Sequence, residues 1–174
     1  MVITDDLVQC KVHLPRGVVA FVSPQDIAWA SQSRWSVSTK RNGLYAVLST
    51  NKNCYLHREV AARAGVDISQ FVDHKNQNTL DNRRLNLRAA TIAQNNCNKR
   101  VRSDSFSGVK GITFDKRRNK YQARVTWEGK THWAGHYDTV EEAVAAVTEL
   151  RIRLHGEFAN ADEQGAIEFQ KRKT

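Results

Sequence analysis

Short apolar runs separated by polar turn residues organise the first part of the chain. Residues 17–22, GVVAFV, predict a short buried strand. Ser23, Pro24 and Asp26 follow, and these residue types are favoured at the N-cap, at the first helical position and in the first turn of a helix. The pattern therefore predicts a helix that begins at Pro24.

Alternating apolar and polar residues continue over residues 34–60. The Asn42-Gly43 dipeptide inside this stretch is a strong hairpin signal, so we expect two antiparallel strands with their turn at this dipeptide. Residues 55–65, YLHREVAARAG, then predict a helix that is closed by Gly65, a residue type common just after a helix C-terminus.

The next segment is mostly polar. Residues 71–74, FVDH, predict a short strand, residues 75–82, KNQNTLDN, a polar turn, and residues 83–90, RRLNLRAA, a return strand. Thr91 and Gln94 have the spacing of a capping box, which indicates that a helix begins there. The predicted order is strand, long turn, strand and helix.

The second half of the chain predicts three strands followed by one helix. The strands are residues 108–115, 120–129 and 130–138. The helix begins at a capping box formed by Thr139 and Glu142 and ends at Gly156. Its apolar positions share one face and are expected to pack against the three-stranded sheet: Val140, Ala143, Val144, Val147, Leu150 and Leu154.

These elements predict an α+β protein built from two modules. The first module is expected to span residues 1–98, with its functional core at 55–98. A basic linker over 99–107, a sheet module over 108–160 and a basic tail over 161–174 complete the expected organisation.

Composition indicates the kind of partner. The 174 residues carry a formal net charge of +9, with a pI of about 9.7, which favours a polyanionic partner. No apolar run approaches the roughly 18 residues of a membrane span, and the N-terminus does not resemble a secretory signal. Nucleic acid is therefore expected rather than a membrane.

The cysteines favour a reducing compartment. There are three, without CxxC pairs, which argues against a disulfide framework and against a four-cysteine zinc site. A mixed zinc site built from Cys54, His57, His74 and Cys97 is a minor alternative, because the second pair lacks the usual finger-like spacing.

The basic charge is concentrated around the start of the sheet module. Between Lys99 and Lys130 there are ten Lys or Arg and three Asp or Glu. Aromatic residues are interleaved with them: Phe114, Tyr121, Trp127 and Trp133. Basic residues on one face of a small sheet can contact phosphates and base edges, whereas Trp127 and Trp133 could equally pack in the core or contact DNA.

The polar segment carries residue types suited to phosphodiester hydrolysis, which requires a base, a water and a cation. His74 suits the base and Asp73 a metal ligand, and adjacent strand residues point to opposite faces. Asn86 on the return strand could orient the imidazole, and Asn95 could add a second oxygen ligand. The alternative is a solvated surface hairpin without catalytic function.

The same residues resemble the His-Asn-His (HNH) nuclease motif, the ββα-metal site of phage homing endonucleases. The matching pieces are LHREVA, VDH, LDNR, NLR and QNN. The resemblance implies that His74 is the general base, Asp73 and Asn95 (or Asn96) the metal ligands, and Asn86 the residue that orients the base. It implies one Mg²⁺ or Mn²⁺ per site, since amide and carboxylate oxygens suit hard cations.

The resemblance also covers the upstream pair His57 and Arg58. His57 is expected to support the site, and Arg58 is expected to meet a phosphate. Three further arginines near the motif are expected to contact flanking phosphates, although each could be a solvated surface charge: Arg83, Arg84 and Arg88.

Residues 106–160 resemble the APETALA-type, ethylene-response-factor DNA-binding domain through GV, KYQARV, WAGHYDTVEEA and HGEFAN. This implies a three-stranded antiparallel sheet on one helix, with the sheet in the major groove. Lys110, Arg124 and Trp133 match its DNA-facing positions, and the first hairpin would grip the backbone through Arg117, Arg118 and Lys120. The strands carry fewer Arg than those of plant members, so base specificity cannot be carried over.

Together the patterns predict a homing-type, metal-dependent endonuclease that nicks or cuts double-stranded DNA. Its expected location is the cytoplasm, that of the host if the chain is phage-encoded. The protein is expected to act as a monomer, or as a dimer on DNA. The alternatives are a non-catalytic, sequence-specific DNA-binding regulator and an RNA-binding module.

Overall fold

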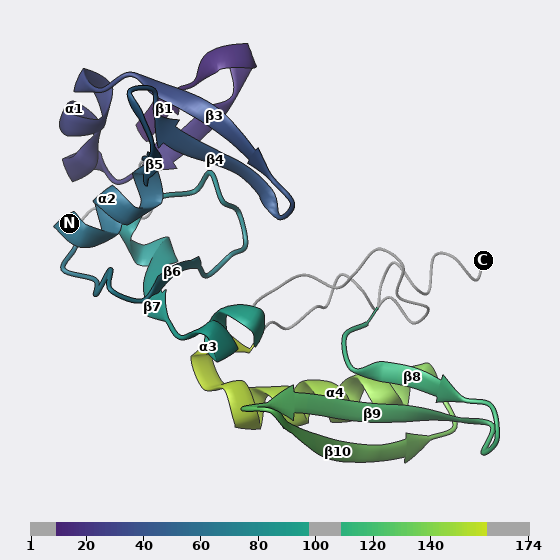
Figure 1. Ribbon diagram of the computed structural model, residues 1–174. Helices are drawn as coiled ribbons and strands as arrows, with labels where there is room; N and C mark the ends of the chain where they lie inside the picture. The colour runs from purple at the N-terminus through teal and green to yellow at the C-terminus, as the bar shows by residue number, and fades with distance from the viewer. Residues whose placement is uncertain (1–9, 98–108, 160–174) are drawn as a thin grey trace, which may run out of the picture. The chain divides into compact units, whose positions relative to one another are not determined.

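A computed structural model describes residues 10–97 and 109–159 of the chain. The chain divides into two compact units, Met1–Thr91 and Ile92–Thr174 (Figure 1). The predicted linker at 99–107 and the predicted tail at 161–174 lie outside the described residues.

Over residues 10–91, the first unit contains three small antiparallel sheets and two α-helices. Its elements in chain order are β1 (Cys10–His13), β2 (Val19–Val22), α1 (Pro24–Gln32), β3 (Trp35–Lys40), β4 (Gly43–Leu48), β5 (Asn51–Tyr55), α2 (Leu56–Arg63), β6 (Phe71–His74) and β7 (Leu87–Ala90). β1 pairs with β2, β3 and β5 flank β4, and β6 pairs with β7. Strand β1 and the separate strand β5 were not among the predicted elements.

The predicted helix starts are confirmed, but one cap differs. α1 begins at Pro24, and Ser23 precedes it in extended conformation without a side-chain cap. The Ser23 hydroxyl instead accepts a hydrogen bond from the backbone N–H of Arg84, at 2.9 Å. The residue that looked like a local cap thus contacts the distant polar segment. α2 ends before Gly65, whose φ of 76° suits glycine.

The hairpin is confirmed, but its turn lies one residue earlier than predicted. Lys40 pairs with Gly43, so Arg41 and Asn42 form the turn. Gly43 has a φ of 142° and opens β4. A Cβ at Gly43 would lie 2.7 Å from the Thr79 hydroxyl, so close packing against the polar segment explains why glycine occupies this position.

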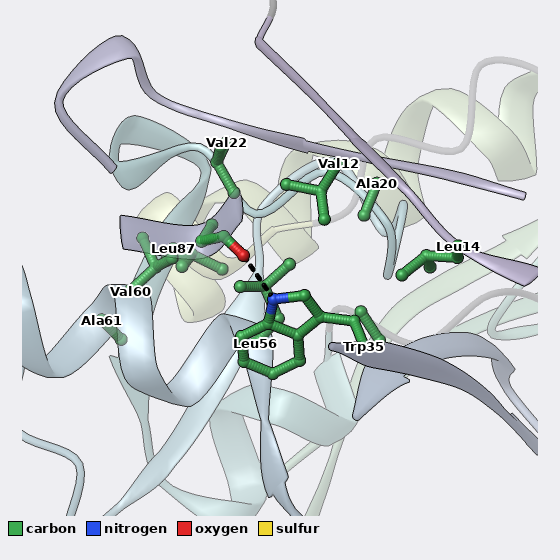
Figure 2. Packing of buried hydrophobic residues seen from close by; sticks show 11 residues of the cluster. Val12, Leu14, Ala20, Val22, Trp35, Leu56, Val60, Ala61 and Leu87 are labelled. Carbon is green, nitrogen blue, oxygen red and sulfur yellow. Dashed lines mark hydrogen bonds between the residues drawn. The ribbon is translucent and has the colours of Figure 1, made fainter. Parts of the chain in front are cut away.

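A single apolar core lies beneath these elements (Figure 2). Trp35, the first residue of β3, is buried there, and its indole N–H donates to the Ala30 carbonyl of α1 at 2.8 Å. Leu56 and Val60 of α2 and Leu87 of β7 pack into the same cluster. The core therefore joins the N-terminal strands to the helix and strand that flank the polar segment.

The polar segment forms a shorter ladder than predicted. β6 and β7 pair from Phe71 with Ala90 to His74 with Leu87, which places Asp73 opposite Arg88. Residues Arg84–Asn86, predicted as strand, form a 3-10 turn. Because the chain turns there, these residues leave the ladder: Arg84 reaches Asp26 of α1, Leu85 is exposed, and the Asn86 side chain bonds the loop.

The second unit is a three-stranded antiparallel sheet packed on one helix, as predicted. It comprises α3 (Ile92–Cys97), β8 (Ile112–Asp115), β9 (Lys120–Trp127), β10 (Lys130–Tyr137) and α4 (Val140–His155), with strand order β10-β9-β8. α4 packs against one face of the sheet (Figure 1). The Thr139–Glu142 capping box is present in both directions. The helix α3, which we assigned to the first module, belongs to this unit.

Across the described ranges, 10–97 and 109–159, no helix combines the length and the apolar character that crossing a membrane requires.

Candidate active site

The loop between β6 and β7 is held by its own amide side chains. The Asn86 side chain accepts from the Asn76 backbone N–H at 3.0 Å, and it donates to the Asn76 side-chain oxygen at 2.9 Å and to the Asp81 carbonyl at 2.7 Å. Asn76 in turn donates to the Asp81 carboxylate at 2.7 Å. Since Asn86 and Asp81 are buried, these bonds define one shape for the loop.

His74 is held by Asn82 and not by Asn86. The His74 Nε2 lies 3.1 Å from the Asn82 side-chain oxygen, and the Asn82 amide nitrogen donates to the Leu80 carbonyl at 3.2 Å. The expectation that Asn86 orients the imidazole directly is therefore wrong, because its side chain is occupied by the loop backbone. Asn86 instead holds the backbone of the loop that carries Asn82.

This pairing assigns a tautomer to His74. An amide oxygen accepts only, so the proton of a neutral imidazole lies on Nε2, and Nδ1 carries the lone pair. Burial lowers the pKa of His74, while the bond to Asn82 and the charges of Asp73 and Asp81 act to raise it. A neutral imidazole with Nδ1 as its basic atom suits a general base.

The loop is fixed to the N-terminal strands. The Phe21 N–H of β2 donates to the Leu80 carbonyl at 2.8 Å, and the Asn82 N–H donates to the Phe21 carbonyl at 2.7 Å. The Asn82 side chain is only 1% exposed. Thus β2, far upstream in the chain, fixes the residue that holds His74. A motif-based prediction could not find Asn82, because its contact depends on this distant strand.

His57 lies directly beside His74, with ring centroids 5.1 Å apart. Burial, together with the neighbouring His74 and Arg58, lowers the pKa of His57 to about 3. His57 is therefore neutral at physiological pH, and its uncharged ring packs against the His74 ring. The expectation that His57 supports the site agrees with this position.

Asp73 is buried on the ladder beside His74 and pairs with Arg88. The Arg88 guanidinium donates twice to Asp73 Oδ2, at 3.0 and 2.9 Å. A carboxylate next to a candidate base suits a hard divalent cation, which needs few protein ligands because water and phosphate supply the rest. Among the residues with described positions, no group of three or more His, Cys, Asp or Glu side chains could hold a metal ion.

The second expected ligand, Asn95, lies on α3 and is half-buried, and its neighbour Asn96 is exposed. Because α3 belongs to the second unit, the ligand role of either residue remains a prediction.

Comparisons with known proteins agree with this constellation. The family model described as HNH endonuclease matches residues 54–97. The chain is 34% identical over 99 residues to Protein 3.8 of Escherichia phage T7, covering 57% of this chain and 81% of that protein. It is 32% identical over 147 residues to the uncharacterized HNH endonuclease L560 of Acanthamoeba polyphaga mimivirus, covering 83% of this chain and 74% of that protein.

The chain belongs to the HNH endonuclease family. No solved structure matches it with significance.

In this HNH endonuclease the arginines near the motif contact the protein itself. Arg83 pairs with Asp81 at 2.7 Å, and Arg84 forms a two-bond fork on Asp26 with both distances at 2.8 Å. Arg58 donates to the carbonyls of Ile68 and Gln70. These contacts show structural roles, and the expected phosphate contacts of the arginines remain predictions.

The second unit of this HNH endonuclease presents Arg124 and Trp133 on the sheet face away from α4. The two residues pair across β9 and β10, and the guanidinium lies 5.7 Å from the ring centre. Trp133 is 56% exposed, whereas Trp127 packs its ring 5.0 Å from that of His155. The sequence allowed either core packing or DNA contact for each tryptophan, and the two differ. Trp127 packs against the end of α4, and Trp133 faces solvent.

The other residues predicted to contact DNA lie in different surroundings. Lys120 pairs with Asp138, and Arg118 lies near Asp115 on the first hairpin, where Arg117 is exposed. Lys110 does not extend from the sheet face, because its ammonium donates to the Asn96 and Cys97 carbonyls at 2.9 and 3.0 Å. Such a contact satisfies the last carbonyls of α3.

Proposed function

We propose that this protein is a homing-type DNA endonuclease that hydrolyses phosphodiester bonds with His74 as general base. The observation that carries the proposal is the buried His74 imidazole, held at Nε2 by Asn82 and placed beside the Asp73 carboxylate. With its Nε2 proton held by a neutral amide, the imidazole keeps Nδ1 as its basic atom, as a general base requires.

In the proposed reaction, Nδ1 of His74 takes a proton from a water molecule. The resulting hydroxide attacks phosphorus in line, and the bond from phosphorus to the 3′ oxygen breaks. Asn82 keeps the Nε2 proton in place while the ring becomes charged. The neighbouring imidazole of His57 stays neutral and therefore adds no positive charge next to His74.

Asp73 and Asn95, with Asn96 as the alternative, would hold one Mg²⁺ or Mn²⁺. Their hard oxygen donors suit either ion. When bound, such an ion supplies charge neutralisation at the phosphate and at the departing oxygen. Arg88 keeps the Asp73 carboxylate in place from the opposite strand.

We further propose that the second unit binds duplex DNA in the manner of an ethylene-response-factor domain. Support comes from its three-stranded antiparallel sheet on one helix and from the solvent-facing Arg124–Trp133 pair. A flat sheet face with a cation and an aromatic ring can enter a major groove. Arg117 on the first hairpin would contact the backbone.

Cleavage of a supercoiled plasmid library in Mg²⁺ and in Mn²⁺ tests the nuclease proposal. Wild type should convert supercoiled plasmid to nicked or linear forms. His74→Ala should lower the rate by roughly 10²- to 10⁴-fold, as expected for loss of a general base. DNA binding, measured by fluorescence anisotropy, should persist in the variant.

His13→Ala is the matched control, since His13 is an exposed histidine on β1. It should cut like wild type. Inactivity of wild type with both metals, combined with tight DNA binding, would instead favour a DNA-binding regulator.

A further inference from the structure

Tyr45 of β4 contacts both histidines, although it precedes the residues that the family model matches. Its ring centre lies 5.6 Å from that of His57 and 6.3 Å from that of His74, the latter in an edge-on arrangement of 65°. A residue from the N-terminal hairpin therefore forms part of the immediate surroundings of the proposed base.

The position of Tyr45 is fixed by a bond to the loop. The Thr79 hydroxyl donates to the carbonyl of Leu44, the residue before Tyr45, at 2.6 Å. Thr79 can approach because Gly43 has no side chain. Since Thr79 lies in the same loop as Asn82, this bond ties the strand that carries Tyr45 to the loop that holds His74.

The Tyr45 hydroxyl is oriented and near the surface. Asn42 of the hairpin turn donates to it at 2.8 Å, in an exposed hydrogen bond. In the described part of the chain, the bond from Asn42 is the one hydrogen bond of the Tyr45 hydroxyl. The hydroxyl oxygen accepts this bond, so its own proton is not used. The hydroxyl proton therefore points away from Asn42 and can be donated to a ligand.

The proton also stays on the oxygen. Burial raises the pKa of Tyr45 above its ordinary value, the bond from Asn42 opposes this, and the charges of Tyr55 and Asp73 raise it further. At neutral pH the side chain is therefore a phenol and a hydrogen-bond donor.

We propose that Tyr45 is a catalytic residue whose hydroxyl donates a hydrogen bond to a non-bridging oxygen of the scissile phosphate. This rests on the proposed function. Charge on those oxygens must be stabilised during attack, and a neutral donor on a ring that packs against His74 can serve that purpose without repelling Asp73. No proton is transferred from Tyr45, so the stoichiometry of the hydrolysis is unchanged.

The experiment compares Tyr45→Phe with wild type in single-turnover plasmid cleavage at saturating protein and Mg²⁺. The variant keeps the ring that packs on His57 and His74 and removes only the donor. Its cleavage rate should fall roughly 10- to 100-fold, the size expected for one hydrogen bond to a charged group. DNA affinity and the melting temperature should match those of wild type.

Tyr55→Phe is the matched control. In the described ranges, the ring contacts of Tyr55 are with Tyr45 and His57. Its loss of a hydroxyl should leave the rate within about twofold of wild type, since no bond to a charged group is removed.

A wild-type rate for Tyr45→Phe would overturn the proposal, as would a loss confined to DNA affinity. If Tyr45→Phe melts early, Asn42→Ala decides instead, because it keeps the tyrosine and frees the hydroxyl from its orienting bond. A rate several-fold below wild type supports the proposal, and an unchanged rate overturns it. Failure of wild type itself to cut would count against the proposed function and not against Tyr45 alone.

Discussion

The two units differ in the burial of the ion pairs next to their candidate functional residues. In the first, Arg84 forks onto Asp26, which is 1% exposed, and Arg88 pairs with Asp73 inside the site. In the second, the described pairs of the sheet lie at the surface, as with Lys120 and Asp138, whose side chains are 42% and 75% exposed. Buried pairs fix positions, whereas exposed cations attract a polyanion. The difference separates a unit in which ion pairs fix the geometry of the site from one in which the pairs of the sheet reach solvent.

The pair of Arg84 and Asp26 in the first unit offers the largest expected effect on stability. Asp26→Asn removes the charge partner of Arg84 and should lower the free energy of unfolding by about 2–3 kcal/mol. This is less than a fully buried pair would lose, because Arg84 reaches solvent. Urea denaturation measures the change.

Asp138→Asn in the second unit is the comparison, and it should change stability by less than about 0.5 kcal/mol. Equal effects of the two substitutions would show that burial does not distinguish the units.

His155 differs from these exposed groups of the second unit, because it is buried and, among the described residues, neither of its ring nitrogens has a hydrogen-bond partner. Burial, with Arg151 and Lys110 nearby, lowers its pKa from 6.5 to about 4. The unfolded chain therefore binds the proton more readily than the folded one. Neutral His155 makes its full contribution to the free energy of unfolding above pH 6.5, and this contribution is lost as the pH falls towards 4.

When the pH falls from 7 to 5, this linkage should lower the free energy of unfolding of the second unit by about 1–2 kcal/mol. Denaturation of wild type and His155→Leu at both pH values measures it, and the leucine variant should lose less stability on acidification. His132→Leu, which replaces a histidine of β10, serves as control and should keep the wild-type pH dependence. The same acid sensitivity in His155→Leu would contradict the assignment.

The smallest effects are expected on the exposed sheet face. Arg124→Ala should weaken DNA binding by about tenfold or less, and Arg117→Ala by less again while reducing the salt slope by about one. Neither should alter the cleavage rate on saturated DNA. Affinity measured from 50 to 200 mM salt, beside single-turnover cleavage, tests both. A reduced rate at saturation would place these residues in catalysis.

Local signals predicted the second unit well, because its elements are set by neighbours in sequence. The Thr139 cap, the Gly156 stop and the apolar stripe of α4 each act over a few residues. In the first unit the sequence pattern located Asp73 and His74 in the ladder. It gave the wrong partner for the imidazole, because the Asn82 backbone is bonded to β2, far upstream in the chain, and no local pattern shows that contact.

The same limit explains the other differences. The partners Arg84 and Asp26 are 58 residues apart, so no local pattern could pair them. The hairpin turn shifted by one residue because Gly43 is needed against Thr79 rather than at the turn centre. Whether Asn95 holds a metal depends on the relation of α3 to the ladder, which short-range spacing does not determine.

Hydrogen bonds join the loop to Phe21 and Leu44, and they limit how short a fragment of this nuclease can be in an engineered protein. A fusion enzyme that carries only residues 54–97 would contain the family's signature, but the Asn82 and Thr79 contacts would have no partners. The smallest transplantable cutting unit should therefore start upstream of Phe21. Chimeras made by exchanging the hairpin of a relative should work only when the exchanged segment keeps a glycine at the position of Gly43.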